Sequence, residues 1–182
     1  MKTKLPLYLA LLLLTQCSKC KNDPTPADPT SQLPPATQTG ANTFGCLVNG
    51  QVYIPGGNAG PSNFGVLYEL GPMGANLNIQ TYRINKNGRQ YINLSCGPVT
   101  QVRAYSLNIP VTEGTASYTN TYLPTQCSSY DGNMPPLHRK GQLVITRLDT
   151  SKGIIAGTFE VTFYQPGCDT LKITQGRFDA KF

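Results

Sequence analysis

The stretch GIIAGTFEVTFY, residues 153–164, decides the fold class of this chain. In it, large apolar residues alternate with polar ones. The apolar set is Ile155, Phe159, Val161 and Phe163, and the polar set is Thr158, Glu160 and Thr162. A period of two is typical of a β-strand with one buried and one solvated face. The stretch therefore predicts an antiparallel strand at the surface of a β-domain.

The residues on either side of this stretch extend the pattern. Leu143 and Ile145 alternate before it, and the turn sequence DTSKG, residues 149–153, joins the two segments into a hairpin. In the last segment, Leu171 and Ile173 are odd-numbered, whereas Phe178 and Ala180 are even-numbered. One face of a regular strand cannot hold both sets. We therefore expect a β-bulge, rather than a turn, at residues 175–176, because glycine suits a bulge.

Two further hairpins are predicted nearer the N-terminus. Asn49-Gly50 separates two short apolar runs, and Asn-Gly is the strongest short hairpin signal. Residues 85–88 separate the strands 77–84 and 89–96 in the same way. Residues 99–109 are a further strand candidate, while residues 56–72 and 113–139 have the composition of longer loops.

Together these segments predict eight to ten short strands in one all-β domain, residues 44–182. The strand pattern is consistent with an antiparallel β-sandwich or a partly open β-barrel and does not separate the two. No apolar repeat with helical period accompanies it beyond the first residues of the chain.

The N-terminus has the pattern of an export signal. Lys2 and Lys4 precede an apolar run of about ten residues, which fits a signal peptide and is too short to span a bilayer. Leu14-Thr15-Gln16-Cys17 resembles a bacterial lipobox, although Gln16 replaces the usual small residue. We expect residues 1–16 to be a lipoprotein signal peptide and Cys17 to be acylated. The alternative is an ordinary secretory signal, and Cys20 is either free or in an intermolecular disulfide.

Residues 17–43 are rich in proline and threonine and nearly lack large apolar residues. Such a segment buries too little surface to offset its ordering entropy. We expect it to be a disordered linker between the lipid anchor and the domain.

The domain contains four cysteines, Cys46, Cys96, Cys127 and Cys168. An even count in an exported domain predicts two disulfides, with three ways to pair them. We favour Cys96–Cys127 with Cys46–Cys168. The alternative is one disulfide and two buried free thiols.

Catalytic and metal-binding signatures are absent from the sequence. His138 is the single histidine and adjoins two cations, which disfavours its use as a base or a metal ligand. Glu160 lies on the wet face of a strand, but no second carboxylate is selected as its partner, as a glycosidase would require. We expect no enzyme activity, no cofactor and no metal.

Charge and aromatic residues limit the partners. The formal charge of +6 falls to +4 without the leader, and the remaining cations are scattered, so we expect no nucleic acid. Tyr118, Tyr122 and Tyr130 lie in a polar segment beside Cys127 and are the candidate binding loop, because exposed tyrosines stack on sugars or protein surfaces.

Two segments carry a family resemblance. The opening TGANTFGCLVNG, residues 39–50, and the ending ITQGRFD, residues 173–179, resemble a family of Bacteroidetes lipoproteins that carry a domain of unknown function. The resemblance implies a lipid-anchored, all-β protein of the cell envelope. We expect it to be anchored to the outer membrane, facing either the periplasm or the cell surface. It transfers no active site.

The function expected from the sequence is therefore a non-enzymatic binding or structural domain held in the cell envelope. Its partners would be the membrane, through the lipid, and a protein or a glycan. The alternatives are a carrier of a small apolar ligand in a lipocalin-like barrel, or a hydrolase.

Overall fold

The computed structural model describes residues 28–71, 74–86, 88–133 and 136–182. The predicted signal peptide, Cys17 and Cys20 lie outside these ranges. The described part contains two short 3-10 turns, η2 (Pro29–Gln32) and η3 (Thr125–Cys127). It contains no helix that is long and apolar enough to cross a membrane.

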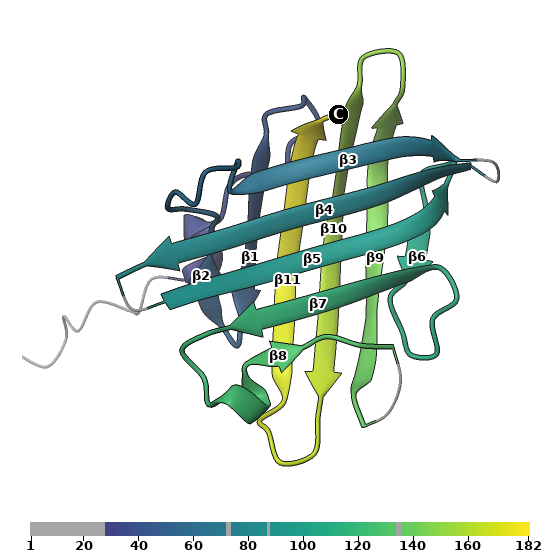
Figure 1. The fold of residues 1–182 in the computed structure, drawn as a ribbon. Coiled ribbons are helices and arrows are strands. Elements are labelled where there is room, and N and C mark those ends of the chain that lie inside the picture. The colour runs from purple at the N-terminus through teal and green to yellow at the C-terminus, as the bar shows by residue number, and fades with distance from the viewer. Residues whose placement is uncertain (1–27, 72–73, 87, 134–135) are drawn as a thin grey trace, which may run out of the picture.

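Two antiparallel sheets form the domain (Figure 1). The six-stranded sheet has the order β2-β1-β11-β10-β9-β6, and the five-stranded sheet has the order β3-β4-β5-β7-β8. The strands of the first sheet are β1 (Thr43–Val48), β2 (Gln51–Tyr53), β6 (Ala104–Ser106), β9 (His138–Asp149), β10 (Ile154–Tyr164) and β11 (Leu171–Lys181). Those of the second are β3 (Phe64–Gly71), β4 (Gly74–Asn85), β5 (Gly88–Val99), β7 (Gly114–Asn120) and β8 (Ser129–Tyr130).

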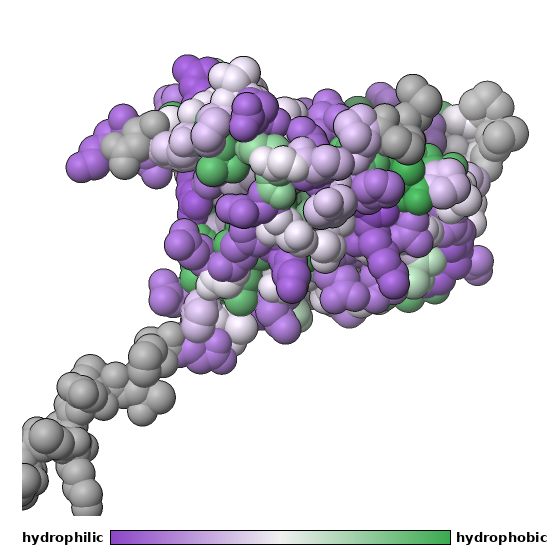
Figure 2. Space-filling model, turned by 90° about the horizontal axis from the view of Figure 1, so that it is seen from below, coloured by the Kyte–Doolittle hydropathy of each residue, from purple (hydrophilic) through white to green (hydrophobic). Residues whose placement is uncertain are grey.

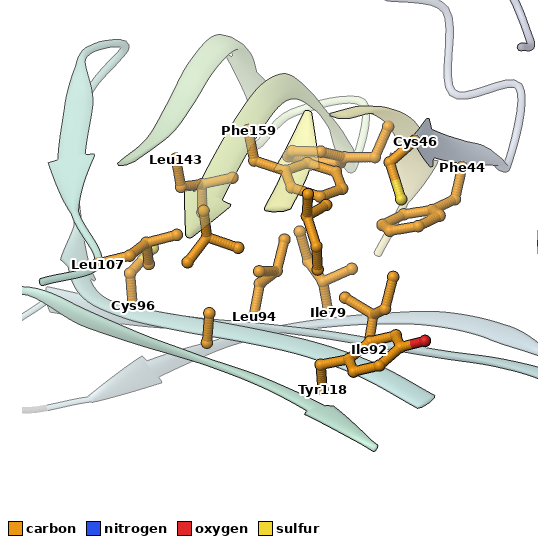
Figure 3. Packing of buried hydrophobic residues seen from close by; sticks show 14 of the residues in the cluster. Phe44, Cys46, Ile79, Ile92, Leu94, Cys96, Leu107, Tyr118, Leu143 and Phe159 are labelled. Carbon is orange, nitrogen blue, oxygen red and sulfur yellow. The ribbon is translucent and has the colours of Figure 1, made fainter. Parts of the chain in front are cut away.

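The strands of the two sheets cross at a steep angle, with one hydrophobic core between them (Figure 1). Figure 3 shows the core side chains of both layers meeting face to face. Phe159 and Leu143 of one sheet point toward Ile79 and Leu94 of the other, and all four are buried. The architecture is a β-sandwich and not a closed barrel, which confirms the first of the two predicted arrangements.

The alternation of apolar and polar residues predicted for residues 153–164 is confirmed in β10. Ile155, Phe159, Val161 and Phe163 are buried, and Thr158 and Glu160 between them are exposed. The Asn49-Gly50 turn between β1 and β2 also forms as predicted. Asn49 has φ 48° and Gly50 has φ 79°, values that an Asn-Gly hairpin turn requires.

The bulge in β11 is confirmed as well. Phe159 pairs with Gly176, but Val161 pairs with Ile173, so one residue of β10 faces two of β11. Gln175 takes up the irregularity with φ 54°. Gly176 lies under the Phe159 ring, where a Cβ atom would come within 2.6 Å of three ring carbons.

Two expected loops contain strands. β3 lies within residues 56–72, and both β7 and β8 lie within residues 113–139. β3 was missed because its outward positions also include the apolar Leu67, which breaks the alternation. β7 was missed because its inward positions include Gly114 and Ala116, which are too small to give a strand signal. The strand expected at residues 99–109 is limited to β6.

The linker prediction is wrong from residue 28 onward. Residues 28–42, called the strap below, lie on the outer face of the six-stranded sheet. Leu33 of the strap is buried. Pro34 packs over Gly45 of β1, at a point where a Cβ atom would lie only 2.6 Å from the Pro34 Cδ. The Thr37 hydroxyl also donates a hydrogen bond to the Asp179 carboxylate of β11. These contacts hold the strap on the sheet, and the sequence pattern alone did not reveal them.

Candidate functional site

The candidate site is a trough on the outer face of β9, β10 and β11. Two adjoining hollows, of about 450 and 210 Å³, share Gln142 of β9 and Glu160 of β10. The larger hollow is also lined by Asn108, Lys140, Gly141, Val161, Thr162, Ile173 and Thr174, and the smaller one by Val144, Thr158, Phe159 and Gln175. The volume of the larger hollow is within the usual range for small-molecule sites, about 300–1,000 Å³.

The bulge in β11 positions this trough. At the bulge, two residues of β11, Thr174 and Gln175, lie opposite the single residue Glu160 of β10. Thr174 lines the larger hollow and Gln175 lines the smaller one. A bulge bends its strand and re-aims the side chains on it. A non-glycine residue with positive φ, here Gln175, stores backbone strain, and such residues concentrate at functional sites.

The strap limits the trough at one end. Arg177, two residues beyond Gln175, donates a hydrogen bond to the carbonyl oxygen of Pro34 at 3.4 Å. The strap thus covers the outer face near Arg177 and Asp179, whereas none of its residues lines either hollow of the trough.

Both hydrogen-bond donors and hydrogen-bond acceptors line the trough. Glu160 Oε1 accepts a hydrogen bond from Gln142 Nε2 at 3.2 Å, and these two residues are direct cross-strand neighbours. Lys140 and Thr162 form the next cross-strand pair on the outer face, two residues further along each strand. Of the described lining residues, Glu160 is the single carboxylate, so the arrangement lacks the paired carboxyl groups of a glycoside hydrolase.

An aromatic pair lies beyond the Lys140–Thr162 pair on the same outer face of β9 and β10. His138 at the start of β9 pairs with Tyr164 at the end of β10, and their ring centroids are 5.9 Å apart. The sequence placed His138 in a solvated loop, but it begins a strand. Tyr164 is about half exposed, so its ring is accessible next to the polar row.

Two of the three tyrosines of the predicted binding loop are unavailable to a partner. Tyr118 and Tyr130 point into the core and are buried, and burial raises the pKa of Tyr118 to about 12. Tyr122 is partly exposed, but its hydroxyl group contacts Asn85 and Gly88 of the β4–β5 hairpin. In Figure 2 the end of the molecule seen from below is mainly hydrophilic, with apolar residues in separate spots.

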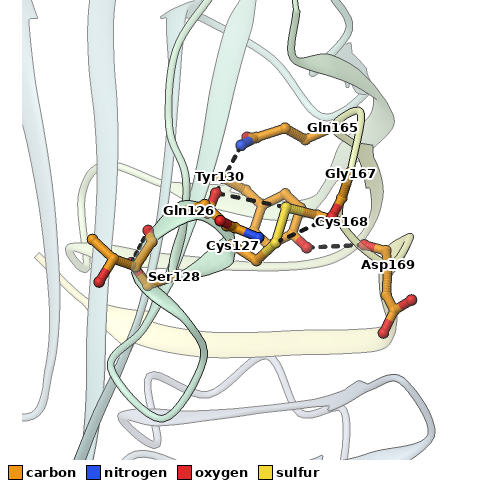
Figure 4. The surroundings of a disulfide bond; sticks show 9 residues. Gln126, Cys127, Ser128, Tyr130, Gln165, Gly167, Cys168 and Asp169 are labelled. Atoms are coloured by element: carbon orange, nitrogen blue, oxygen red, sulfur yellow. Dashed lines mark hydrogen bonds between the residues drawn. A yellow bond between two sulfur atoms is a disulfide. The ribbon is translucent and has the colours of Figure 1, made fainter.

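The favoured disulfide pairing is wrong. Cys127 is bonded to Cys168, with the Cα atoms 5.6 Å apart, which joins η3 to the turn between β10 and β11 (Figure 4). Gln165 Nε2 donates to the Gln126 carbonyl oxygen across the same junction at 3.0 Å, and the Tyr130 hydroxyl donates to the Asp169 carbonyl oxygen at 2.9 Å. Sequence spacing carried no information on which loops meet at this end of the sandwich.

Cys46 and Cys96 are free and buried in the core. Burial raises the pKa of both thiols, that of Cys96 to about 12. The structure therefore has the alternative arrangement of one disulfide and two buried thiols, and these thiols act as small apolar residues.

The comparisons with known proteins add no relative. No family model, no curated protein and no solved structure matches the chain. The described residues also contain no group of three or more His, Cys, Asp or Glu side chains that could hold a metal ion.

Proposed function

We propose that this chain is a lipid-anchored protein of the cell envelope whose sandwich domain binds, without catalysis, a hydroxyl-rich ligand such as a glycan. The observation that carries the proposal is the lining of the trough. Amide, hydroxyl, ammonium and carboxylate groups line it together at Gln142, Thr162, Lys140 and Glu160.

A glycan fits this lining for two reasons. Each sugar hydroxyl both donates and accepts hydrogen bonds, and the trough offers acceptors and donors side by side. One cation and one carboxylate give the lining no net charge, which favours a neutral ligand. The exposed ring of Tyr164 adds an apolar face at the end of the row, suited to the C–H face of a sugar.

The anchoring part of the proposal rests on the lipobox-like sequence before Cys17 and on the strap. Because η2, which begins at Pro29, lies beside β2, and Thr37 is hydrogen-bonded to Asp179, the chain from Cys17 to Pro29 separates the lipid from the domain. At about 3.3–3.6 Å per residue, that length spans at most about 40 Å.

Binding to soluble neutral polysaccharides tests the function. Affinity electrophoresis or calorimetry with the full chain should show saturable binding. Gln142→Ala and Glu160→Ala should each weaken it about tenfold, the loss expected for one or two hydrogen bonds. The matched control is Asn78→Ala with Gln80→Ala, which removes similar side chains from a hollow on the outer face of β3 and β4. Equal affinity in all variants would remove the trough from the proposal.

Anchoring is tested separately. Cells that express the wild-type chain and take up radiolabelled palmitate should label it, and Cys17→Ser should abolish the label. A labelled Cys17→Ser variant would show that the acylated residue lies elsewhere.

A further inference from the structure

The two sheets end in four edge strands, and three of these are blunted. β2 and β6 have three residues each, and β8 has two. Side chains also occupy backbone groups at these strands. Arg83 Nη1 donates to the Val52 carbonyl oxygen at 2.7 Å, and the Ser106 amide donates to Glu113 Oε2 at 2.7 Å. Short and occupied edges of this kind prevent pairing with another chain.

The edge strand β3 differs from the other three. It has eight residues in an uninterrupted ladder with β4, from Phe64 opposite Thr81 to Gly71 opposite Gly74. Between described residues, no hydrogen bond outside this ladder reaches the backbone of residues 65–71. The strand contains no proline and a single charge, Glu69. A long, regular edge with free backbone groups is a template for a further strand.

Apolar side chains are exposed along the same edge. Leu67 is 52% exposed and Leu70 is 87% exposed, the highest value among the large apolar residues of the described chain. The ring of Tyr68 contacts that of Phe182 at 4.6 Å between centroids, and Phe182 is itself partly exposed. Figure 1 shows the β9–β10 hairpin rising past β3 behind this edge, with the C-terminus near it. The six-stranded sheet therefore forms a backing layer beyond β3.

We propose that the free edge of β3 binds one extended segment of another protein, which adds to the five-stranded sheet as a further strand. Main-chain hydrogen bonds would supply affinity, and alternate side chains would supply specificity, as in other cases of strand addition. The fitting segment has apolar residues at every second position, to cover Phe182 and Leu70, and a cation opposite Glu69.

The backing layer selects a segment rather than a second copy of this chain. Two copies paired antiparallel through β3 would form one continuous sheet, with both six-stranded sheets on the same side of it. Each copy's β9–β10 hairpin rises past its own β3 (Figure 1), so the two backing layers would compete for the same space. A single strand needs only about 4.8 Å of width and fits in front of this layer.

A synthetic peptide of alternating valine and threonine, flanked by lysines, is the probe. Fluorescence anisotropy with the full chain should show saturable binding, and amide hydrogen exchange at residues 65–71 should slow when the peptide is bound. The same peptide with proline in place of each threonine should not bind, because proline has no N–H group to donate.

Variants locate the site. Leu67→Lys and Gly65→Lys place a like charge against the lysine-flanked peptide and should weaken binding at least about tenfold. A Cβ atom on Gly65 meets no atom within 4 Å, so this second variant preserves the fold. Val102→Lys is the matched control, since Val102 is 56% exposed and lies outside β3, and it should leave affinity unchanged.

Three results would overturn the proposal. They are the absence of saturable binding, equal affinity in the β3 variants and Val102→Lys, and protection from exchange that lies outside residues 65–71. Dimerisation of the free chain in sedimentation, abolished by Leu67→Lys, would replace the segment by a second copy.

Discussion

Two buried charges, Asp179 and Arg139, hold different parts of this domain, and neither has a salt-bridge partner among the described residues. Asp179 lies on β11 under the strap. Its carboxylate accepts five hydrogen bonds, from the Thr37 hydroxyl, the Thr39 hydroxyl and the amides of residues 39, 40 and 41. The N–H and O–H donors of one short segment, residues 37–41, thus stabilise a buried anion.

Arg139 lies on β9 and faces the other sheet. Its guanidinium group donates to the carbonyl oxygens of Leu107 at 2.6 Å, Ala116 at 2.9 Å and Gly132 at 3.0 Å, and to Asn133 Oδ1 at 3.2 Å. The cation therefore joins three separate segments of both layers, whereas Asp179 fastens a single segment from outside. This difference predicts that Arg139 contributes more to global stability and that Asp179 acts more locally.

The largest effect is expected from Arg139→Met. The variant removes the guanidinium donor from the buried carbonyl oxygens of Leu107 and Ala116, and each such group costs about 1–3 kcal/mol when it is left without a donor. We expect the free energy of unfolding to fall by about 4 kcal/mol in urea titrations. Lys140→Met, on the exposed face of the same strand, should change it by less than about 0.5 kcal/mol. A loss no greater than that of the control would show that water replaces the guanidinium group.

Removing the disulfide comes second. With a sequence separation of 41 between Cys127 and Cys168, the chain-entropy relation gives about 3–4 kcal/mol for Cys127→Ala with Cys168→Ala. The bridge and Arg139 bind the same loop, on opposite sides of β8, so combining these changes with Arg139→Met should cost less than the sum. If the losses in unfolding free energy measured by urea titration are strictly additive, the disulfide and Arg139 stabilise the loop independently.

The strong strands of this fold are predictable from sequence, and so is the bulge. Phe159, Val161 and Phe163 are large enough to mark the buried face by themselves. The change from odd to even positions between Ile173 and Phe178 reveals the bulge without any tertiary information. Small or exposed residues do not mark a face in this way, which explains why β3 and β7 were missed.

The trough was only half predictable. Glu160 was placed on the solvated face, but its neighbours depend on register. A second irregularity, between the pairs Ala156–Arg147 and Gly157–Ile145, shifts β9 by one residue along β10. Without it, the turn at residues 149–153 would pair Glu160 with an inward residue of β9. The pairs of Glu160 with Gln142 and of His138 with Tyr164 both depend on this shift. Its only local sign is the change from odd-numbered Leu143 and Ile145 to even-numbered Leu148, which also packs against the core.

The strap was not predictable because its main partner is distant. Asp179 looks like an ordinary polar residue of the last strand, and the strap's threonines and prolines look like those of any spacer. Only folding brings residues 37–41 over β11. The disulfide pairing has the same limitation, since it depends on which two loops meet.

Asp179→Asn is expected to have the third-largest effect. The amide nitrogen of asparagine is a donor and would face the strap's own donors. It would replace either Oδ1, which accepts one of the five hydrogen bonds, or Oδ2, which accepts the other four. We expect a loss of about 2–3 kcal/mol in unfolding free energy and much faster proteolysis within residues 28–42. Asp169→Asn, an exposed change of the same kind, is the control. Unchanged proteolysis of the strap would contradict the role given to Asp179.

The pH dependence of stability gives the smallest effect and the sharpest contrast between the two charges. Burial pushes the pKa of Asp179 upward, but the hydrogen bonds from Thr37, Thr39, Gly40 and Ala41 outweigh it and hold the pKa below its ordinary value. A carboxylate whose pKa is lower in the folded state stabilises the fold above its unfolded pKa, about 3.9, and this contribution is lost as the pH falls through the folded value.

The wild-type chain should therefore lose stability in acid more steeply than Asp179→Asn below about pH 4. Asp149 and Glu113 also have lowered pKa values, set mainly by hydrogen bonds from Arg147 and from the Ser106 amide, respectively. Both remain in the variant, so the difference between the two curves isolates Asp179. Arginine stays protonated over this range, so Arg139→Met should lower the whole curve without changing its shape. Parallel curves for wild type and Asp179→Asn would show that the strap is held by the shape of the side chain and not by its charge.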